Sequence, residues 1–472
     1  MRYLIRILIL CLAVLAALPA VAAASHGQLA LFQDDRKLLQ RGSGVRDQTL
    51  NELRALGVDA IKFQLDWNAA APGDKTRPQG FDGRDPSAYD LAPYDGLVNA
   101  AQARGFRVMV ALSPPAPGWA TARRGDSFGV DRPSPTWFGR FAEAAGRHFT
   151  GIDLWTLWNE PNHPGFLYPQ ATKGRAAFAP HLYRKLVRAA VAGLQRAGHG
   201  GNTILFGELL PIGKSHLYKN NTIKPLRFMR EFFCIGSHSR ECRHYRPLTG
   251  VRGFAYHPYT RPNGPRGREP STDDATIRSI GRVTRLLDRA RALGRIRGGR
   301  LPVWNTEFGF QSNPPDPFQT RLSRIPGFLS ESEWISYGNP RVASFSQYTL
   351  VDTPVSRRGD LFGTWQGGLR FADGREKRGV FEAYRQPLFV RLLGPRGVEV
   401  WGDARPGGAG ATVQIQQRLA GHGFSNLGGP ITVTNARGYF SKRFRLSKAE
   451  RRTFRFIEAG SLTSRSAKPL FR

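Results

Sequence analysis

The hydrophobic positions of this chain repeat one pattern: apolar residues at helical spacing, then a glycine, then a nearly continuous apolar run. Leu50, Leu53 and Leu56 lead to Gly57, and the run at 58–67 follows. Glycine suits the left-handed residue that ends a helix, so each unit predicts a helix followed by a strand. Ser134 and Pro135 open another such helix as cap and first turn. The pattern recurs before Gly105, Gly198 and Gly294.

Eight apolar runs are candidate strands, at 29–32, 58–67, 106–115, 152–160, 203–211, 250–259, 301–310 and 342–352. Strands that alternate with helices are typical of a parallel sheet covered by helices. Eight such units predict an α/β fold, the (β/α)8 TIM barrel. A doubly wound open sheet is the competing architecture. It normally carries a glycine-rich phosphate loop after its first strand, and residues 29–37 contain none.

The pattern changes near residue 390, where short alternating segments are separated by Gly, Pro and Asn. The runs "ATVQIQQR" at 411–418 and "TFRFIEAGS" at 453–461 are examples. This alternation predicts a small antiparallel, sandwich-like β domain. We therefore expect a barrel domain at 25–390 and a β-rich accessory domain at 391–472.

The first 24 residues have the pattern of a secretory signal peptide. Arg2 and Arg6 precede an apolar run at 7–18, and "AVAAAS" offers small-residue cleavage sites. The run is shorter than the ~20 apolar residues of a membrane span, so we expect a secreted protein, cell-surface associated or free, with no membrane span after cleavage. Cleavage removes Cys11, and in an oxidising compartment Cys234 and Cys242 form a disulfide. Two unpaired thiols are the alternative.

The charge balance is strongly basic, with 69 Lys and Arg against 36 Asp and Glu and a net charge of +33. The excess is mostly Arg spread along the whole chain, which indicates a basic folded surface, not a disordered tail. No nucleic-acid motif accompanies the charge, so a nucleic-acid partner is not favoured. Anionic polymers of the cell envelope are a candidate partner, and a merely solvated Arg-rich surface is the simplest explanation.

Polar residues stand where three of the predicted strands end. Asn159 and Glu160 end the fourth, Glu307 ends the seventh, and His257 and Tyr259 follow the sixth. Active-site residues of a barrel lie at the carboxyl ends of its strands. Two carboxylates facing each other there suit glycosidic cleavage, in which one protonates the leaving oxygen and the other attacks or stabilises the anomeric carbon. The sequence therefore predicts a glycosidase site.

The paired motifs "WNEPN" at 158–162 and "WNTEFGF" at 304–310 resemble those of secreted bacterial glycoside hydrolases of clan A, such as the cellulase-type family five and the xylosidase-type family thirty-nine. The resemblance covers roughly residues 28–390. It implies retaining hydrolysis of β-linked glycans, with Glu160 as general acid/base and Glu307 as nucleophile. It also implies that Asn159 binds the sugar 2-hydroxyl, that Tyr259 supports the nucleophile, and that His257 lines the same wall.

The chain departs from the clan at two strands. The second strand carries Lys62 where relatives often carry Arg, and Lys lacks the planar fork for a bidentate grip on nucleophile or substrate. The eighth strand usually supplies a Trp platform for the sugar, and here Gln347 and Tyr348 stand near its end, with Trp365 later. These departures bear on the substrate more than on the chemistry.

Other residues carry two interpretations each. Glu208 is a third strand-end acid that either contacts substrate or forms a structural pair. Asp66 and Asp352 fit helix caps or salt bridges.

No metal-ligand cluster, serine nucleophile elbow or phosphate loop is present, so we expect no metal and no cofactor. Three tryptophans are candidate sugar platforms or core residues: Trp67, Trp119 and Trp304.

The sequence also allows a different class of protein. A non-catalytic glycan-binding or envelope-binding protein on the same barrel would use the cleft without chemistry. Loss of either glutamate would mark that outcome, and both are present. We expect a monomer whose substrate is an oligosaccharide or a polysaccharide.

Overall fold

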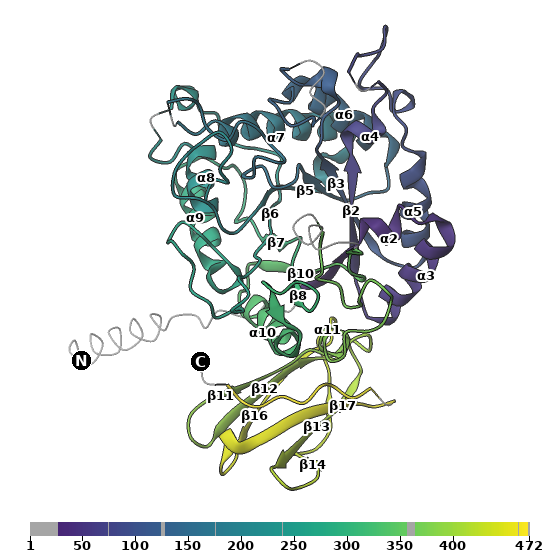
Figure 1. Cartoon of the computed structure of the whole chain (residues 1–472), viewed down its shortest axis with the longest axis vertical. Helices are drawn as coiled ribbons and strands as arrows, with labels where there is room; N and C mark the ends of the chain where they lie inside the picture. Colours follow the sequence, from purple (N-terminus) through teal and green to yellow (C-terminus); the bar gives the residue numbers. More distant parts are fainter. Residues whose placement is uncertain are drawn as a thin grey trace, which may run out of the picture.

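The computed structural model describes residues 27–73, 75–123, 128–174, 176–237, 239–355, 364–460 and 462–470. Its first domain is a closed barrel of eight parallel strands in the order β1-β10-β7-β6-β5-β4-β3-β2 (Figure 1). The predicted TIM barrel is therefore confirmed, and all eight predicted strands are present. Their bounds are β1 Leu29–Gln33, β2 Ala60–Asp66, β3 Arg107–Ser113, β4 Leu154–Leu157, β5 Thr203–Leu209, β6 Gly253–Tyr256, β7 Val303–Asn305 and β10 Val342–Tyr348.

Helices surround the barrel (Figure 1). The largest helix–helix contact joins α6 to α7 on consecutive units. Ser134 caps α6 through its side chain, which accepts a hydrogen bond from the amide of Trp137, as the sequence predicted. The helices are α2 Asp35–Leu38, α3 Gly42–Ala55, α4 Trp67–Ala70, α5 Ala92–Ala103, α6 Pro135–His148, α7 Ala179–Arg196, α8 Pro225–Phe232, α9 Gly281–Ala292, α10 Ile325–Tyr337 and α11 Val380–Arg385.

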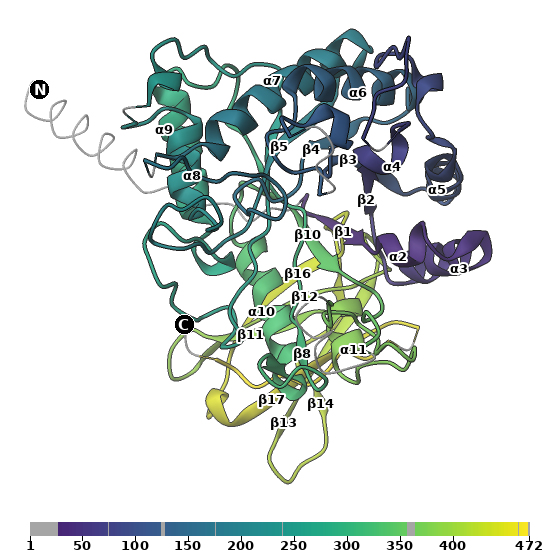
Figure 2. The ribbon, with the colours of Figure 1, turned by 45° about the horizontal axis from the view of Figure 1, so that its top comes forward.

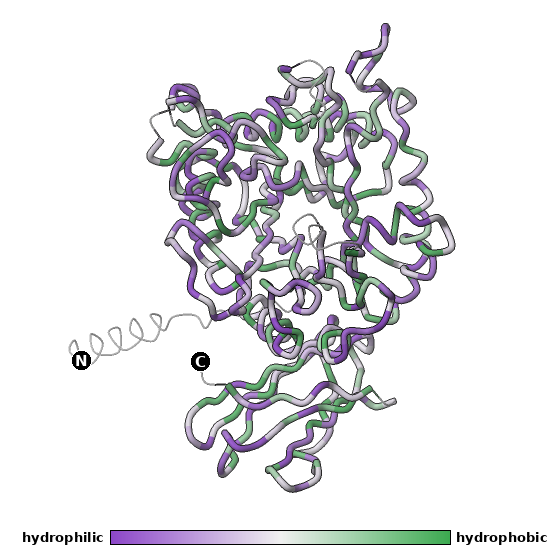
Figure 3. Tube along the Cα trace, in the orientation of Figure 1, coloured by the Kyte–Doolittle hydropathy of each residue, from purple (hydrophilic) through white to green (hydrophobic). Residues whose placement is uncertain are grey.

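The C-terminal domain is a pair of antiparallel sheets, as predicted. One sheet has the order β11-β12-β16, and in the other β13 pairs with β14, β15 and β17. Hydropathy alternates along these strands (Figure 3), and most of their apolar positions form one core. Phe389, Trp401 and Tyr439 form a separate cluster. The strands are β11 Leu388–Leu392, β12 Gly397–Asp403, β13 Thr412–Leu419, β14 Ser425–Asn426, β15 Ile431–Thr432, β16 Tyr439–Arg445 and β17 Arg452–Glu458.

The boundary between the domains lies slightly earlier than predicted. β11 begins at Leu388 and pairs along its length with β12, so a boundary at 390 would cut a strand of the second sheet. The sequence could not place this point because β11 and the preceding helix α11 are both apolar and only one residue pair, Gln386-Pro387, separates them.

The C-terminal domain packs against α10 of the barrel (Figure 2). Trp334 of α10 stacks on Phe389 with ring centroids 4.5 Å apart, and Tyr337 contacts Trp401 and Tyr439. Gly57 also belongs to this contact: its φ is +74°, and a Cβ there would lie 2.9 Å from the Cβ of Arg405. The close approach as well as the helix end therefore requires glycine at this position.

The predicted signal peptide at 1–24, including Cys11, lies outside the described residues. Among the helices that the structure describes, none combines the length and the apolar character needed to span a bilayer. The predicted disulfide between Cys234 and Cys242 is present, in the loop after α8.

Candidate active site

Glu160 and Glu307 meet at the carboxyl end of the barrel. Glu160 follows β4 and Glu307 follows β7, and both line one cleft of about 440 Å³. A carboxyl oxygen of each lies within 4.8 Å of the other. Each residue is buried except for 8–9% of its surface. The structure therefore brings together the two acids that the sequence paired, within reach of one small group in the cleft.

The chain turns sharply to present Glu160. Trp158 and Glu160 both have positive φ, at 73° and 40°, a conformation that non-glycine residues seldom adopt. Trp158 is held in place because its indole donates to the carbonyl of Phe166 and its ring packs edge-on against Phe138. Strained backbone held by tight packing is typical of functional sites. Pro161 follows directly, where the strand can no longer continue.

Tyr259 supports Glu307, as the resemblance implied. Its hydroxyl donates to Oε1 of Glu307 at 2.7 Å. Its ring lies between Phe308, which it stacks on, and Trp365, which it meets edge-on at 5.2 Å. One oxygen of Glu307 is thus fixed, while the carboxyl group still faces the cleft.

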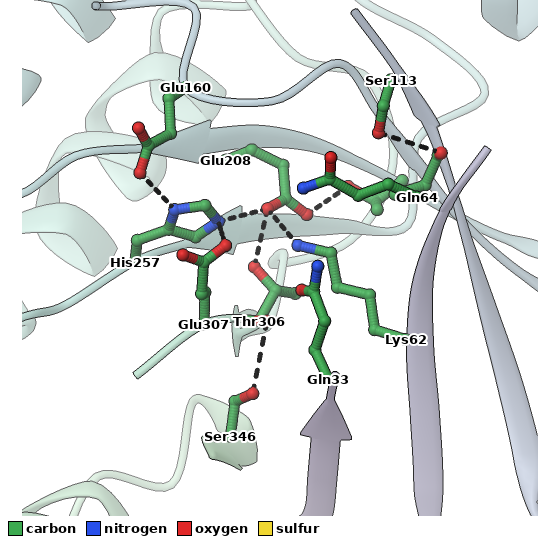
Figure 4. A network of polar contacts seen from close by, with 12 residues as sticks. Gln33, Lys62, Gln64, Ser113, Glu160, Glu208, His257, Thr306, Glu307 and Ser346 are labelled. Carbon is green, nitrogen blue, oxygen red and sulfur yellow. Dashed lines mark hydrogen bonds and ion pairs between the residues drawn. The ribbon is translucent and has the colours of Figure 1, made fainter. Parts of the chain in front are cut away.

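His257 lies between the two glutamates (Figure 4). Its Nδ1 is 3.0 Å from Oε1 of Glu160, and its Nε2 is 3.7 Å from Oε2 of Glu307. The same Nε2 contacts Oε2 of Glu208 closely. His257 has no exposed surface. It therefore contacts both cleft acids from the buried side of the site.

Glu208 and Lys62 form a buried ion pair beneath the cleft. Lys62 Nζ lies 2.8 Å from Glu208 Oε2, and neither side chain is more than 1% exposed. Thr156 and Thr306 each donate a hydroxyl to Glu208, at 2.6 and 3.0 Å. Of the two interpretations of Glu208, the structure therefore supports a structural ion pair and not a contact with substrate. Lys62, expected to contact substrate, has no surface in the cleft and reaches it only through other side chains.

The charges of this cluster shift its pKa values in opposite directions. Burial raises the pKa of Glu160, although the hydrogen bond and charge of His257 oppose that shift. Burial would also raise the pKa of Glu208, but the charges of Lys62 and His257 outweigh it and lower the pKa. Burial acts to lower the pKa of His257, yet the carboxylates of Glu307 and Glu208 raise it to about 10. The site therefore favours a protonated Glu160 beside a cationic histidine.

Asn159 is positioned next to Glu160 and is 5% exposed. Its amide oxygen Oδ1 is buried and accepts no hydrogen bond from the described residues. A buried amide oxygen without a donor is costly, so this atom is suited to accept a bond from a hydroxyl group. The predicted contact with a sugar 2-hydroxyl remains a prediction.

The three predicted tryptophan platforms do not line the cleft. Trp67 has no exposed surface and stacks on Phe141 outside the barrel. Trp304 packs inside the barrel, within 5.9 Å of Arg107 at the start of β3, which is the opposite end from the site. Trp119 is half-buried against Trp137, and its indole donates to the carbonyl of Pro72. Trp67 and Trp304 are therefore core residues, because their strand or helix positions face packed layers.

Trp365 lines the cleft together with Tyr259 and Phe310. Its indole donates to the carbonyl of Tyr348 at 2.8 Å, which fixes the ring beside the glutamates. It lies in a loop after β10, so no strand periodicity could mark it. Pattern analysis missed Thr156 and Thr306, the hydroxyl partners of Glu208. Both had a usable signal, because each is a polar residue inside an apolar strand motif.

Asp66 and Asp352 have the structural roles that were expected of them. Asp66 caps α4 by accepting from the amide of Ala69 at 2.9 Å. Asp352 pairs with Lys377 at 2.7 Å.

Two groups of side chains in the described residues could geometrically hold a metal ion. In the first, Glu160, Glu307 and His257, both histidine nitrogens already face carboxylates, and a raised pKa keeps the ring cationic. In the second, with His181, the two cysteines are disulfide-bonded and offer no thiolate. In both groups, atoms that could bind a cation already have other partners.

Comparison with known proteins finds no matching family model and no matching curated protein. Among solved structures, the chain is similar to GH5_18 from Streptomyces cattleya in complex with GlcNAc, at 16% identity over 77% of this chain and 80% of that chain, with a TM-score of 0.49. It is also similar to native xylanase 10B from Thermotoga maritima, at 12% identity over 76% and 95%, with a TM-score of 0.47.

A third similar structure is a glycoside hydrolase family 5 protein from Bacteroides vulgatus, at 10% identity over 93% of both chains, with a TM-score of 0.45. All three are glycoside hydrolases, the class that the sequence motifs resemble. The barrel itself is established by the strand pairing.

Proposed function

We propose that the protein is a retaining glycoside hydrolase that cleaves β-linked glycans. The observation that supports this most directly is the spacing of the acids, since an oxygen of Glu160 and one of Glu307 lie within 4.8 Å. Retaining enzymes hold their carboxyl groups about 5–5.5 Å apart, whereas inverting enzymes need about 6.5–9.5 Å to admit a water molecule. The spacing favours direct attack by one carboxylate.

The environments of the two acids favour different roles. Burial raises the pKa of Glu160, which suits a proton donor to the leaving oxygen. Glu307 accepts the Tyr259 hydroxyl and faces the charge of His257, which suits a carboxylate nucleophile. Glu307 then attacks the anomeric carbon, the glycosidic C–O bond breaks, and the proton of Glu160 passes to the leaving oxygen. In the second step Glu160 takes a proton from water, and the hydroxide displaces Glu307.

The first test measures turnover by the mature chain. Release of reducing sugar and nitrophenol is followed on β-glucans, mannans, xylans and aryl β-glycosides, with Glu307→Ala run alongside. Turnover that disappears in the variant supports the hydrolase and identifies its sugar. Proton NMR of the first product supports retention if the β anomer appears before mutarotation, and contradicts it if the α anomer appears first.

A glycan-binding protein without catalysis is the competing function. It predicts that wild type and Glu307→Ala are equally inactive over a broad panel while both retain glycans in a pull-down. Both glutamates lie in the cleft with distinct partners, and this arrangement favours catalysis. A binding protein would gain nothing from keeping two buried acids close together.

We also propose export, from the charged start and apolar run of residues 1–24. Expression of the full chain in a bacterial host should yield a secreted product whose new N-terminus lies after Ala22 or Ala24. An uncleaved product retained inside the cells would contradict export.

A further inference from the structure

Five ionisable side chains share one buried cluster below the cleft, and the double-displacement chemistry uses only two of them. Glu208, Lys62 and His257 come from β5, β2 and the loop after β6, and none has a surface in the cleft (Figure 4). Burying charges is expensive unless each is paired. A cluster of this size therefore calls for a role beyond stability, because apolar residues would fill a barrel at lower cost.

We propose that Glu208 and Lys62 are positioning residues that keep His257 doubly protonated, so that its positive charge faces whichever of Glu160 and Glu307 carries the negative charge during the reaction. The inference rests on the proposed hydrolase function for its catalytic consequence. Its structural part, the charge of His257, stands by itself.

The geometry of His257 requires a proton on Nε2 and provides an acceptor for a second proton on Nδ1. Nδ1 faces Oε1 of Glu160 at 3.0 Å, and Nε2 faces Oε2 of Glu208. Ionised Glu208 can only accept a hydrogen bond, so Nε2 must carry a proton. With Nδ1 also protonated, Oε1 of Glu160 is an acceptor, and the acidic proton of Glu160 is left on Oε2. The cluster thus fixes which oxygen of Glu160 donates to the leaving group.

The net charge of the cluster stays constant through the first chemical step. Before the step, Lys62 and His257 are cationic, Glu208 and Glu307 are anionic, and Glu160 is neutral, so the charges cancel. After it, Glu307 is an ester and Glu160 is a carboxylate, and the charges cancel again. His257 contacts both changing groups, at 3.0 and 3.7 Å. The negative charge therefore moves from one side of the ring to the other without leaving its counterion.

Lys62 gives Glu208 a counterion that cannot reach the cleft. Its single ammonium group meets Oε2 of Glu208 at 2.8 Å. The planar fork of an arginine would extend beyond one oxygen. Asp35 also acts on Lys62 through its charge. Among the described residues, the titratable groups that contact His257 are Glu160, Glu208, Tyr259 and Glu307, and Lys62 is joined to the ring through Oε2 of Glu208.

The test is direct observation of the His257 ring. Protein labelled with ¹⁵N-histidine is titrated from pH 5 to 9, and two-bond ¹H–¹⁵N spectra distinguish an imidazolium from either neutral tautomer. The His257 signals are assigned by their loss in His257→Gln. We expect both ring nitrogens of wild type to stay protonated to pH 8 or above. A ring that becomes neutral below pH 8 overturns the proposal.

Glu208→Gln removes the anion and keeps the shape. We expect the His257 pKa to fall by one unit or more, because the ring then faces the charge of Lys62 without its counterion. The double variant Lys62→Met with Glu208→Gln avoids an unpaired lysine if the single variant does not fold, and its shift should have the same sign but be smaller. The matched control is Thr156→Val, which removes a neutral hydrogen bond from Glu208 and should leave the His257 titration unchanged. An unchanged titration in both Glu208 variants overturns the proposal.

The catalytic consequence is read from the pH profile of kcat/KM. On a dinitrophenyl glycoside, whose leaving group needs no proton from Glu160, the alkaline decline of Glu208→Gln should lie at least one pH unit lower than that of wild type, since His257 loses its charge earlier. Thr156→Val should keep the wild-type limb. A uniform loss of activity with an unmoved profile would overturn the catalytic role. If wild type hydrolyses nothing, the hydrolase proposal fails, while the NMR titration still decides the charge of His257.

Discussion

Among the described residues, one buried ionic cluster lies at the cleft and another lies between the domains. At the cleft are Glu160, Glu307 and His257 above the Lys62–Glu208 pair. Between the domains, Arg405 donates to both oxygens of Glu333 on α10, at 3.0 and 2.8 Å. Arg405 also lies 3.0 Å from Asp403, and Tyr439 donates to Glu333 at 3.1 Å.

Each cluster contains acids whose pKa burial raises. Burial raises the pKa of Glu333 and of Asp403 despite the nearby charge of Arg405, just as burial raises that of Glu160. A shifted pKa therefore does not by itself identify the functional cluster in this protein.

Access separates the two clusters. Glu333 has no exposed surface and Asp403 is 1% exposed, whereas Glu160 and Glu307 keep 9% and 8% of their surfaces open to a cleft. In the interface, Glu333 and Asp403 share Arg405 and are almost fully enclosed. At the cleft, Glu160 and Glu307 share His257 and face a space that a ligand can enter. The comparison teaches that an opening to a ligand, more than burial or a shared cation, marks the chemistry.

The largest expected contrast comes from removing one acid at the cleft. Glu160→Ala should reduce turnover of glycans about 10²- to 10⁴-fold, the contribution of a positioned general acid. With a dinitrophenyl leaving group, which needs no proton, bond cleavage should be far less affected. Steady-state and pre-steady-state rates on both substrate types measure this difference. An equal loss on both substrates would contradict the acid role.

The matching change in the interface should affect stability. Glu333→Gln leaves Arg405 short of a counterion, and breaking a buried ion pair costs about 3–5 kcal/mol. Denaturant unfolding should show this loss, while kcat of the folded variant stays near that of wild type. If kcat collapses at full folding, the two clusters are not separate in function.

Two tyrosines give a closely matched pair of smaller changes. Tyr259 donates to Glu307 at 2.7 Å, and Tyr439 donates to Glu333 at 3.1 Å. A hydrogen bond to a charged group contributes about 1.5–3 kcal/mol. Tyr259→Phe should therefore lower kcat/KM by about 10- to 100-fold, and Tyr439→Phe should lower the free energy of unfolding by a similar energy. Kinetics and unfolding measured on both variants should show opposite patterns.

The mildest probe is pH. Because burial raises the pKa of Glu160, its acid form persists to higher pH than that of an exposed glutamate. The rate on substrates that need a proton should fall as pH rises through this pKa, by up to about tenfold per unit. Glu333→Gln should leave the profile in place, since Glu333 does not face the cleft. A profile that moves with Glu333 would contradict the comparison.

The sequence was sufficient for the architecture of the barrel. Helix, glycine and apolar run recur with local consistency, and each unit can fold its helix against its strand with few distant contacts. Local spacing also identified Glu160 and Glu307, because a polar residue that follows an apolar strand lies at the carboxyl end of the barrel. The disulfide also followed from two cysteines eight positions apart.

Residues whose role depends on distant partners could not be assigned from the sequence. Lys62 and Glu208 are 146 positions apart, and only barrel closure brings them into contact. Trp67 and Trp304 have the composition of sugar platforms, yet packing places one outside the barrel and the other at its far end. Trp365 reaches the cleft from a loop without periodicity.

The sequence by itself determined which elements form, in what order they lie, and that Glu160 and Glu307 are among the acids at strand ends, because these depend on local spacing. Only the tertiary structure decided which charges face each other, since charge pairing depends on how eight strands close around one axis. The roles of Lys62, Glu208 and His257 belong to that second class. Their positions along the chain are known from the sequence, but the effect of each charge depends on neighbours that only the fold brings close.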